Sequence, residues 1–284
     1  DVKWLLEHDK NTYSVLNGDG KYPPGDFRSK ECIELLKQTD IVVTNPPFSL
    51  FREYIKQLIE FEKKFVIIGN LNAITYKEVF PLIKENKIWL GPSITSGDRE
   101  FVIPKDIVDK DKFTGEIRKD IKGNDVYYQR VVGVRWYTNL DHGRRHQALK
   151  LQSAAENLKF AKHKNLKGKT SYDRYDNYDA IEIPLVINIP SDYDGVMGVP
   201  ISFLDKYNPE QFEILGATQR GCHNDVPDIK KYDNYWEVKQ NGQKTGSSGG
   251  KTNENANLVG NDGRKNYFIN KEGRIIQSAY QRIF

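Results

Sequence analysis

The stretch that decides the fold is Asp40-Ile-Val-Val-Thr-Asn-Pro-Pro-Phe-Ser-Leu-Phe-Arg-Glu-Tyr54. Residues 41–44 form a short β-branched run that is too short for a helix, so they predict a buried strand. Beyond residue 49 the apolar side chains recur at helical spacing, at Phe51, Tyr54, Ile55, Leu58 and Ile59. Residues 45–48 therefore form a turn between a buried strand and a helix. Such a turn lies at the carboxyl edge of an α/β sheet, where ligands bind in these folds.

The turn offers hydrogen-bond acceptors and few donors. Pro46 and Pro47 fix two φ angles and remove two backbone N–H groups, and Pro46 also pushes Asn45 out of the helical region. The Asn45 side-chain oxygen and the Pro46 carbonyl remain as acceptors, and Phe48 adds an aromatic face. A flat base with an exocyclic NH2 group matches two acceptors and a stacking ring. Accepting both hydrogens frees the nitrogen lone pair to attack an electrophilic methyl group. A Pro-Pro turn alone usually just closes a loop, but the flanking strand and helix favour a functional turn.

Composition narrows the class of protein. A chain of 284 residues can bury a large core and form one or two domains. The formal charge of +4 permits a phosphate-binding face without requiring one. The two cysteines, Cys32 and Cys222, lie at no metal-ligand spacing and imply no disulfide framework, which fits a reducing cytoplasm. No apolar run approaches ~18 residues, so no membrane span is predicted.

The amino-terminal part predicts elements on both sides of the turn. Residues 11–17 are expected to form a short strand, and residues 64–69 a second buried strand parallel to the first. Asn70 and Asn72 then lie on the same sheet edge as Asn45, where a turn or cap role is favoured over a pocket wall. A helix capped by Ser29 is expected to bury Cys32, Ile33, Leu35 and Leu36.

The next segment predicts a helix, two strands and an insertion. Residues 75–86 have helical spacing that must accommodate Pro81. Residues 88–90 and 131–137 predict short strands. The polar residues 92–128 between them are expected to form a hairpin or a lid near the substrate.

The chain becomes basic after residue 141. The candidate DNA contacts are Arg144, Arg145, Lys162 and Lys164, and aspartates alternate with tyrosines over residues 172–178. Basic residues interleaved with aromatic ones suit phosphate contacts combined with stacking. For any single lysine, a solvated helix face is an equal alternative.

The remaining segments predict a strand, a loop and a hairpin. Residues 195–204 are expected to form a buried strand. Residues 239–263 are poor in apolar residues and predict a mobile loop. Residues 267–269 and 274–276 flank a Lys271-Glu-Gly273 turn and predict a β-hairpin.

Residues 40–54 resemble the catalytic motif of the EcoRI family of adenine-specific DNA methyltransferases. Further stretches resemble the same family, in the same order along the chain, up to about residue 216. They are Ile74-Thr-Tyr-Lys-Glu-Val-Phe-Pro-Leu-Ile-Lys-Glu-Asn-Lys-Ile-Trp-Leu-Gly91, Tyr175-Asp-Asn-Tyr-Asp-Ala180, Gly195-Val-Met-Gly-Val-Pro-Ile-Ser-Phe-Leu204 and Asn208-Pro-Glu-Gln-Phe-Glu213. The Asn-Pro-Pro-aromatic turn is shared with other amino-methylating enzymes, whereas the later stretches are more specific to this family.

The resemblance implies an α/β protein with a Rossmann-like, S-adenosylmethionine-dependent methyltransferase core over residues 1–140. The core would contribute an incomplete part of a seven-stranded sheet, and residues 141–284 would form a C-terminal DNA-recognition region. The implied reaction methylates N6 of adenine in a short site of double-stranded DNA, within a restriction-modification system that includes a cognate restriction endonuclease. The target base must be flipped out of the duplex. Asn45, Pro46, Pro47 and Phe48 would then form the catalytic turn.

The resemblance also points to cofactor residues. In this fold an acidic residue at a strand end hydrogen-bonds the adenine amine of the cofactor, and Asp19 and Asp26 are the two candidates. An ordinary turn role is an equal alternative for each. Family members carry additional cofactor-binding segments before this point, so we expect the chain to be amino-terminally truncated. RNA adenine or a protein glutamine amide is the alternative substrate, and a catalytically silent DNA-binding fragment is the alternative class of protein.

Overall fold

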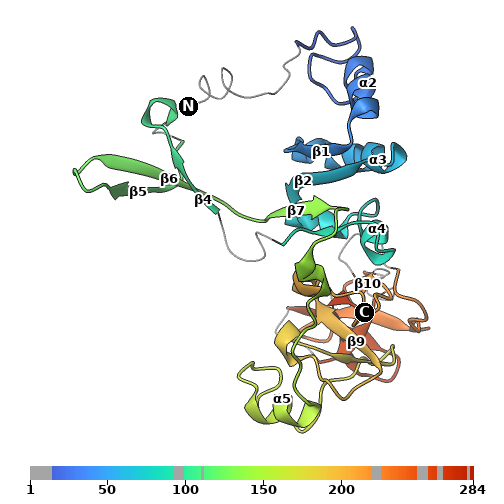
Figure 1. Ribbon diagram of the computed structural model, residues 1–284. Helices are drawn as coiled ribbons and strands as arrows, with labels where there is room; N and C mark the ends of the chain where they lie inside the picture. Colours follow the sequence, from blue (N-terminus) through green and yellow to red (C-terminus); the bar gives the residue numbers. More distant parts are fainter. Residues whose placement is uncertain are drawn as a thin grey trace.

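The computed structural model describes residues 15–92, 99–109, 112–218, 225–247, 255–260, 265–279 and 282–284. Figure 1 shows a mixed α/β protein, in which a small sheet with its helices lies above a larger carboxyl-terminal part. The described helices are α2 (Lys30–Gln38), α3 (Phe51–Glu60), α4 (Phe80–Lys84) and α5 (Ala154–Phe160). None of these helices has the length and apolar character that crossing a membrane requires.

The central sheet contains four described strands in the order β1-β2-β7-β3. Their bounds are β1 (Ile41–Thr44), β2 (Lys64–Asn70), β7 (Val134–Thr138) and β3 (Trp89–Leu90). β1 and β2 are parallel and joined by α3, whereas β7 runs antiparallel to both β2 and β3. The predicted strand, turn, helix and parallel strand are therefore confirmed. Because β1 and β2 are parallel, their carboxyl ends share one sheet edge, as expected for Asn45 and Asn70.

The prediction that residues 41–44 are buried is wrong. Ile41 and Val43 are 47% and 69% exposed. β1 is the end strand of the sheet, with β2 on one side only in the described part of the chain. Ile41 and Val43 alternate with the partly buried Val42 and Thr44, so one face and one edge of β1 are open.

Residues 99–109 and 112–131 form an arm that extends away from the central sheet (Figure 1). Three antiparallel strands build it in the order β4-β6-β5, with bounds β4 (Arg99–Ile103), β5 (Glu116–Lys119) and β6 (Asp125–Val131). A short 3-10 turn, η3 (Lys105–Ile107), follows β4. The expected hairpin is present as β5 and β6.

Two further sheets are described in the carboxyl-terminal part. One has the order β10-β15-β9-β8, with β8 (Ala180–Glu182), β9 (Val196–Pro200), β10 (Ala217–Thr218) and β15 (Arg282–Ile283). The other has the order β11-β13-β14-β12, with β11 (Tyr235–Lys239), β12 (Asn257–Val259), β13 (Asn266–Asn270) and β14 (Ile275–Ser278). The hairpin predicted around residues 271–273 is confirmed as β13 and β14.

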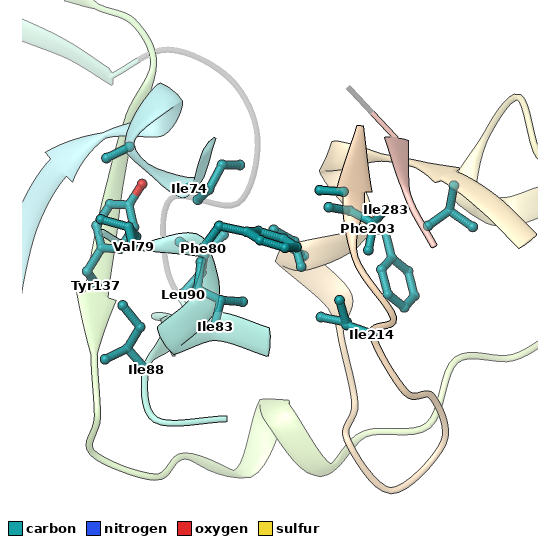
Figure 2. Packing of buried hydrophobic residues seen from close by; sticks show 14 of the residues in the cluster. Ile74, Val79, Phe80, Ile83, Ile88, Leu90, Tyr137, Phe203, Ile214 and Ile283 are labelled. Carbon is teal, nitrogen blue, oxygen red and sulfur yellow. The ribbon is translucent and has the colours of Figure 1, made fainter. Parts of the chain in front are cut away.

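One hydrophobic cluster connects the sheet to the carboxyl-terminal part. It contains Tyr137 of β7, Phe80 of α4 and Phe203 of η6 (Ile201–Lys206). Figure 2 shows Phe80 pointing from α4 toward Phe203 and Ile283. The predicted division at residue 140 therefore runs through a shared core.

Two predictions in the amino-terminal part are corrected. Residues 15–17 form no strand, and residues 11–14 lie outside the described part. Ser29 caps α2 by accepting a hydrogen bond from the Cys32 amide, but only Leu36 is buried on this helix, and Leu35 is 43% exposed.

Three later predictions also change. The helix expected over residues 75–86 is reduced to α4, because Pro81 fits only the first turn of a helix. The strand expected over residues 195–204 ends at Pro200 and continues as η6. The loop expected over residues 239–263 contains β12, which pairs with β14.

Candidate functional site

The Asn45–Phe48 turn links β1 to a short 3-10 helix, η1 (Phe48–Leu50), which leads into α3. Pro47 precedes η1, and its carbonyl accepts a hydrogen bond from the Leu50 amide at 3.0 Å. Pro46 is buried, Asn45 is exposed, and Phe48 is 40% exposed. Within the described residues, neither the Asn45 side chain nor the Pro46 carbonyl forms a hydrogen bond. Two oxygen acceptors, on Asn45 and Pro46, and the accessible ring of Phe48 therefore lie within four residues.

A buried aromatic pair anchors the turn to the sheet. Phe51, the first residue of α3, packs edge-on against Tyr137 of β7, with ring centroids 5.0 Å apart. The Tyr137 hydroxyl donates a hydrogen bond of 2.8 Å to the Asn70 carbonyl, and burial raises the pKa of this tyrosine. Gly69 leaves room for the pair, because a Cβ there would lie 2.5 Å from the Phe51 ring. The position of the turn is therefore set by packing as well as by its prolines.

A cavity of about 510 Å³ lies beside the turn. Asn45, Pro46 and Pro47 line it on one side, and Phe27 and Tyr54 contribute aromatic surface. The two rings are packed edge to face, with centroids 4.8 Å apart. The turn therefore faces a space large enough for a small planar ligand.

Gln57 of α3 also lines this cavity, and sequence reasoning missed it. Its side chain is 9% exposed and donates a hydrogen bond from Nε2 to the Phe27 carbonyl at 3.1 Å. Its Oε1 atom is buried and has no partner within the described residues. The sequence feature that could have identified Gln57 is its position three residues after Tyr54, on the buried side of an amphipathic helix. A buried acceptor without a donor is destabilising unless another molecule or segment supplies one.

Both candidate cofactor carboxylates already form hydrogen bonds or ion pairs with residues close to them in the chain. Asp19 accepts hydrogen bonds from the backbone amides of Tyr22 and Lys30, at 2.8 and 3.0 Å. Asp26 forms an ion pair of 2.8 Å with Arg28. These hydrogen bonds lower the pKa of both aspartates. Neither carboxylate lines the cavity, although Gly25 and Phe27 on either side of Asp26 do.

The structure places the predicted DNA contacts in two separate places. The Arg144 guanidinium donates a hydrogen bond of 2.6 Å to the Pro92 carbonyl, and Arg145 lies 3.8 Å above the Trp89 ring. The Arg145 side chain is only 10% exposed and also contacts Asp141 and Asn86, so these contacts give it a structural role. Lys162 and Lys164 are exposed in the loop after α5. No described group of three or more histidine, cysteine or acidic side chains is arranged to hold a metal ion.

Comparison with known proteins places the chain in a family. The model of the family described as adenine-specific methyltransferase EcoRI matches residues 9–283. The chain is 52% identical over 210 residues to the type II methyltransferase M.EcoRI of Escherichia coli, covering 74% of this chain and 58% of the relative. It is 35% identical to M.MgeORF184P of Mycoplasma genitalium over 213 residues, covering 75% of this chain and 61% of that relative.

A third relative is the type II methyltransferase M.MpnI of Mycoplasma pneumoniae, which is 35% identical over 242 residues, covering 78% of this chain and 71% of the relative. The chain belongs to the EcoRI family of adenine-specific methyltransferases. It spans about three fifths of the length of the first two relatives. No solved structure matches it.

Proposed function

We propose that this protein transfers a methyl group from S-adenosylmethionine to N6 of adenine in a specific site of double-stranded DNA. The observation that carries the proposal is the turn at residues 45–48: Asn45, Pro46 and Pro47 line a cavity of about 510 Å³, and the exposed Phe48 follows them directly. Within the described residues, the Asn45 side chain and the Pro46 carbonyl accept no hydrogen bond. Family membership supports the same reaction. The protein would act in the cytoplasm as part of a restriction-modification system, beside a cognate restriction endonuclease.

The turn would act on the target amine through hydrogen bonds. The Asn45 side-chain oxygen and the Pro46 carbonyl accept the two amine hydrogens, while the adenine ring stacks on Phe48. This geometry turns the nitrogen lone pair out of conjugation with the ring. The amine would then attack the methyl carbon directly while the bond from that carbon to the sulfonium sulfur breaks, so that the thioether leaves and the extra proton passes to water. Because an amine inside a duplex cannot reach the turn, the adenine must first be flipped out.

The residues around the cavity fit the methyl donor. S-adenosylmethionine supplies an electrophilic methyl group on a sulfonium sulfur when bound. Phe27 and Tyr54 offer aromatic surface to a purine ring, and the neighbouring Gln57 has a buried Oε1 atom with no hydrogen-bond partner within the described residues. Asp19 and Asp26 stay the candidates from the family resemblance, and Gln57 is a further polar residue that lines the cavity.

The arrangement of β1, α3 and β2 supports a methyltransferase core in the amino-terminal part. The parallel pair β1 and β2, joined by α3, is the part of the described sheet that a Rossmann-like core requires. We assign residues 1–140 to this core and residues 141–284 to DNA recognition. The exposed lysines Lys162 and Lys164 are suited to phosphate contacts. Arg144 and Arg145 would contribute further phosphate contacts near the end of β3. Arg145 would mainly support the fold there.

The substrate class is tested by competition. The protein is incubated with S-adenosylmethionine that carries a labelled methyl group and with equal amounts of duplex DNA, RNA and glutamine-containing protein. Label is expected on N6 of adenine in the duplex. Label on RNA or on a glutamine amide would reject DNA as the substrate. Calorimetry with S-adenosylmethionine separates an enzyme from a silent DNA-binding fragment, because the fragment would show no binding heat.

A further inference from the structure

A second large groove lies in the carboxyl-terminal part, away from the Asn45 turn. Its volume is about 790 Å³. Its walls come from the loop after α5, from β8 and from the strands β12, β14 and β15. The candidate functional site described above does not use this groove.

The charges in the groove are unequal. Four cationic side chains line it, namely Lys164, Lys169, Arg174 and Arg282, against the two carboxylates Asp173 and Glu182. Each carboxylate already pairs with a cationic side chain of the groove. Lys169 pairs with Asp173, and the Arg282 Nε atom lies 2.8 Å from Glu182. Among the described residues that line the groove, two positive charges are therefore left without a negative partner.

Lys164 and Arg174 carry this excess. Lys164 is exposed and forms no ion pair within the described ranges. Arg174 pairs with Asp179, which lies outside the groove and whose side chain is 93% exposed, so the pair is screened by water. Both cations are therefore available to an anionic ligand.

Gln277 on β14 adds a neutral donor. Its Oε1 atom is buried and has no hydrogen-bond partner among the described residues. Because the oxygen is turned inward, the NH2 end of the amide is the end that a ligand in the groove can reach. The accessible groups of the groove are thus mainly donors, whereas its carboxylate acceptors are occupied by cations.

We propose that this groove binds the phosphodiester backbone of the DNA substrate, with Lys164, Arg174 and Gln277 as the contacts. Phosphate oxygens are acceptors only, and a donor-rich groove with an excess of positive charge matches them. The inference rests on the proposed function for the choice of DNA as the polymer. It adds to that function a defined surface for the backbone and assigns DNA-binding roles to Arg174 and Gln277.

Two lysines of the same loop provide a matched test. Lys164 and Lys167 are both exposed, but only Lys164 lines the groove. The variants Lys164→Gln and Lys167→Gln make the same charge change within three residues of each other. Binding of a fluorescent DNA duplex is measured by anisotropy over a range of salt concentrations, without cofactor, after circular dichroism has shown that both variants are folded.

Lys164→Gln is expected to weaken binding several-fold and to reduce the slope of log K against log salt by about 1, the value for one lost phosphate contact. Lys167→Gln should leave the slope unchanged. Gln277→Glu, which brings a carboxylate to the phosphates, should weaken binding further than Gln277→Ala does. Equal slopes for the two lysine variants would overturn the proposal. A larger Lys164 effect on single-stranded RNA than on the duplex would also overturn it.

Failure of this inference and failure of the proposed function give different results. If methyl transfer to DNA occurs but the two lysine variants bind alike, only the groove assignment is wrong. If Lys164→Gln shows the expected loss of duplex binding but the unmodified protein transfers no methyl group, the groove assignment is supported and the proposed reaction is wrong.

Discussion

Arg135 and Asp205 form a buried bidentate ion pair between β7 of the central sheet and η6 of the carboxyl-terminal part. The Nε–Oδ1 and Nη2–Oδ2 distances are 3.0 and 3.2 Å. The two side chains are 9% and 8% exposed. This pair lies beside the hydrophobic cluster that the two parts share, so it ties the proposed catalytic and recognition regions together.

Asp205→Asn is expected to lower the free energy of unfolding by about 3–5 kcal/mol, because it removes the buried carboxylate that pairs with the Arg135 guanidinium. Urea denaturation measures this change. The control is Asp179→Asn, which removes the exposed partner of Arg174 and should leave the unfolding midpoint unchanged. Equal effects of the two substitutions would mean that the Arg135–Asp205 pair does not stabilise the fold.

Gly69→Ala is expected to destabilise the protein by about 1–3 kcal/mol through overpacking. The added Cβ would lie 2.5 Å from the Phe51 ring and 2.9 Å from the Tyr137 ring, so the pair that anchors the turn must shift. Methyl transfer should fall as well, because Phe51 directly follows η1. Gly143→Ala is the control, since a Cβ there meets nothing within 4 Å. Wild-type stability for Gly69→Ala would show that this packing is not tight.

His146 predicts a pH dependence of stability. Its Nδ1 atom lies 2.7 Å from Glu210 and its Nε2 atom 2.9 Å from Asp141. The hydrogen bond with Glu210, and to a smaller extent the one with Asp141, raises the pKa of His146 above its ordinary value of 6.5. A raised pKa in the folded state stabilises the fold fully below pH 6.5, and this stabilisation is lost as the pH rises through the folded-state pKa.

His146→Gln should therefore lower the urea midpoint most at pH values below 6.5, and the difference from wild type should shrink at higher pH. His163→Gln is the control, because His163 has no carboxylate partner in the part of the chain that the structure describes. A difference for His146→Gln that is the same at every pH would contradict the prediction.

Local patterns predicted the elements that depend on neighbouring residues. The β1–turn–α3 unit follows from a β-branched run, two prolines and a helical stripe. Ser29 predicted the start of α2 because a cap needs only the amides of the next turn. The β13–β14 hairpin follows from a turn of three residues between two apolar runs.

Features that depend on distant contacts could not be predicted in the same way. The exposure of Val43 depends on which strands lie beside β1, and its own sequence does not specify them. The stacking of Arg145 on Trp89 joins residues that are far apart in the chain, so the residues around Arg145 did not predict it. The orientation of the Gln57 amide depends on the Phe27 carbonyl, which is 30 residues away.

The most direct measurement of the central claim is the rate of methyl transfer to duplex DNA by the protein and by its Asn45→Ala variant. If Asn45 orients and polarises the target amine, kcat should fall by about 10²-fold or more. The unfolding midpoint should stay close to that of the unmodified protein, because the exposed Asn45 side chain makes no hydrogen bond within the described structure. An unchanged kcat would contradict the account and remove the Asn-Pro-Pro-Phe turn from the chemistry.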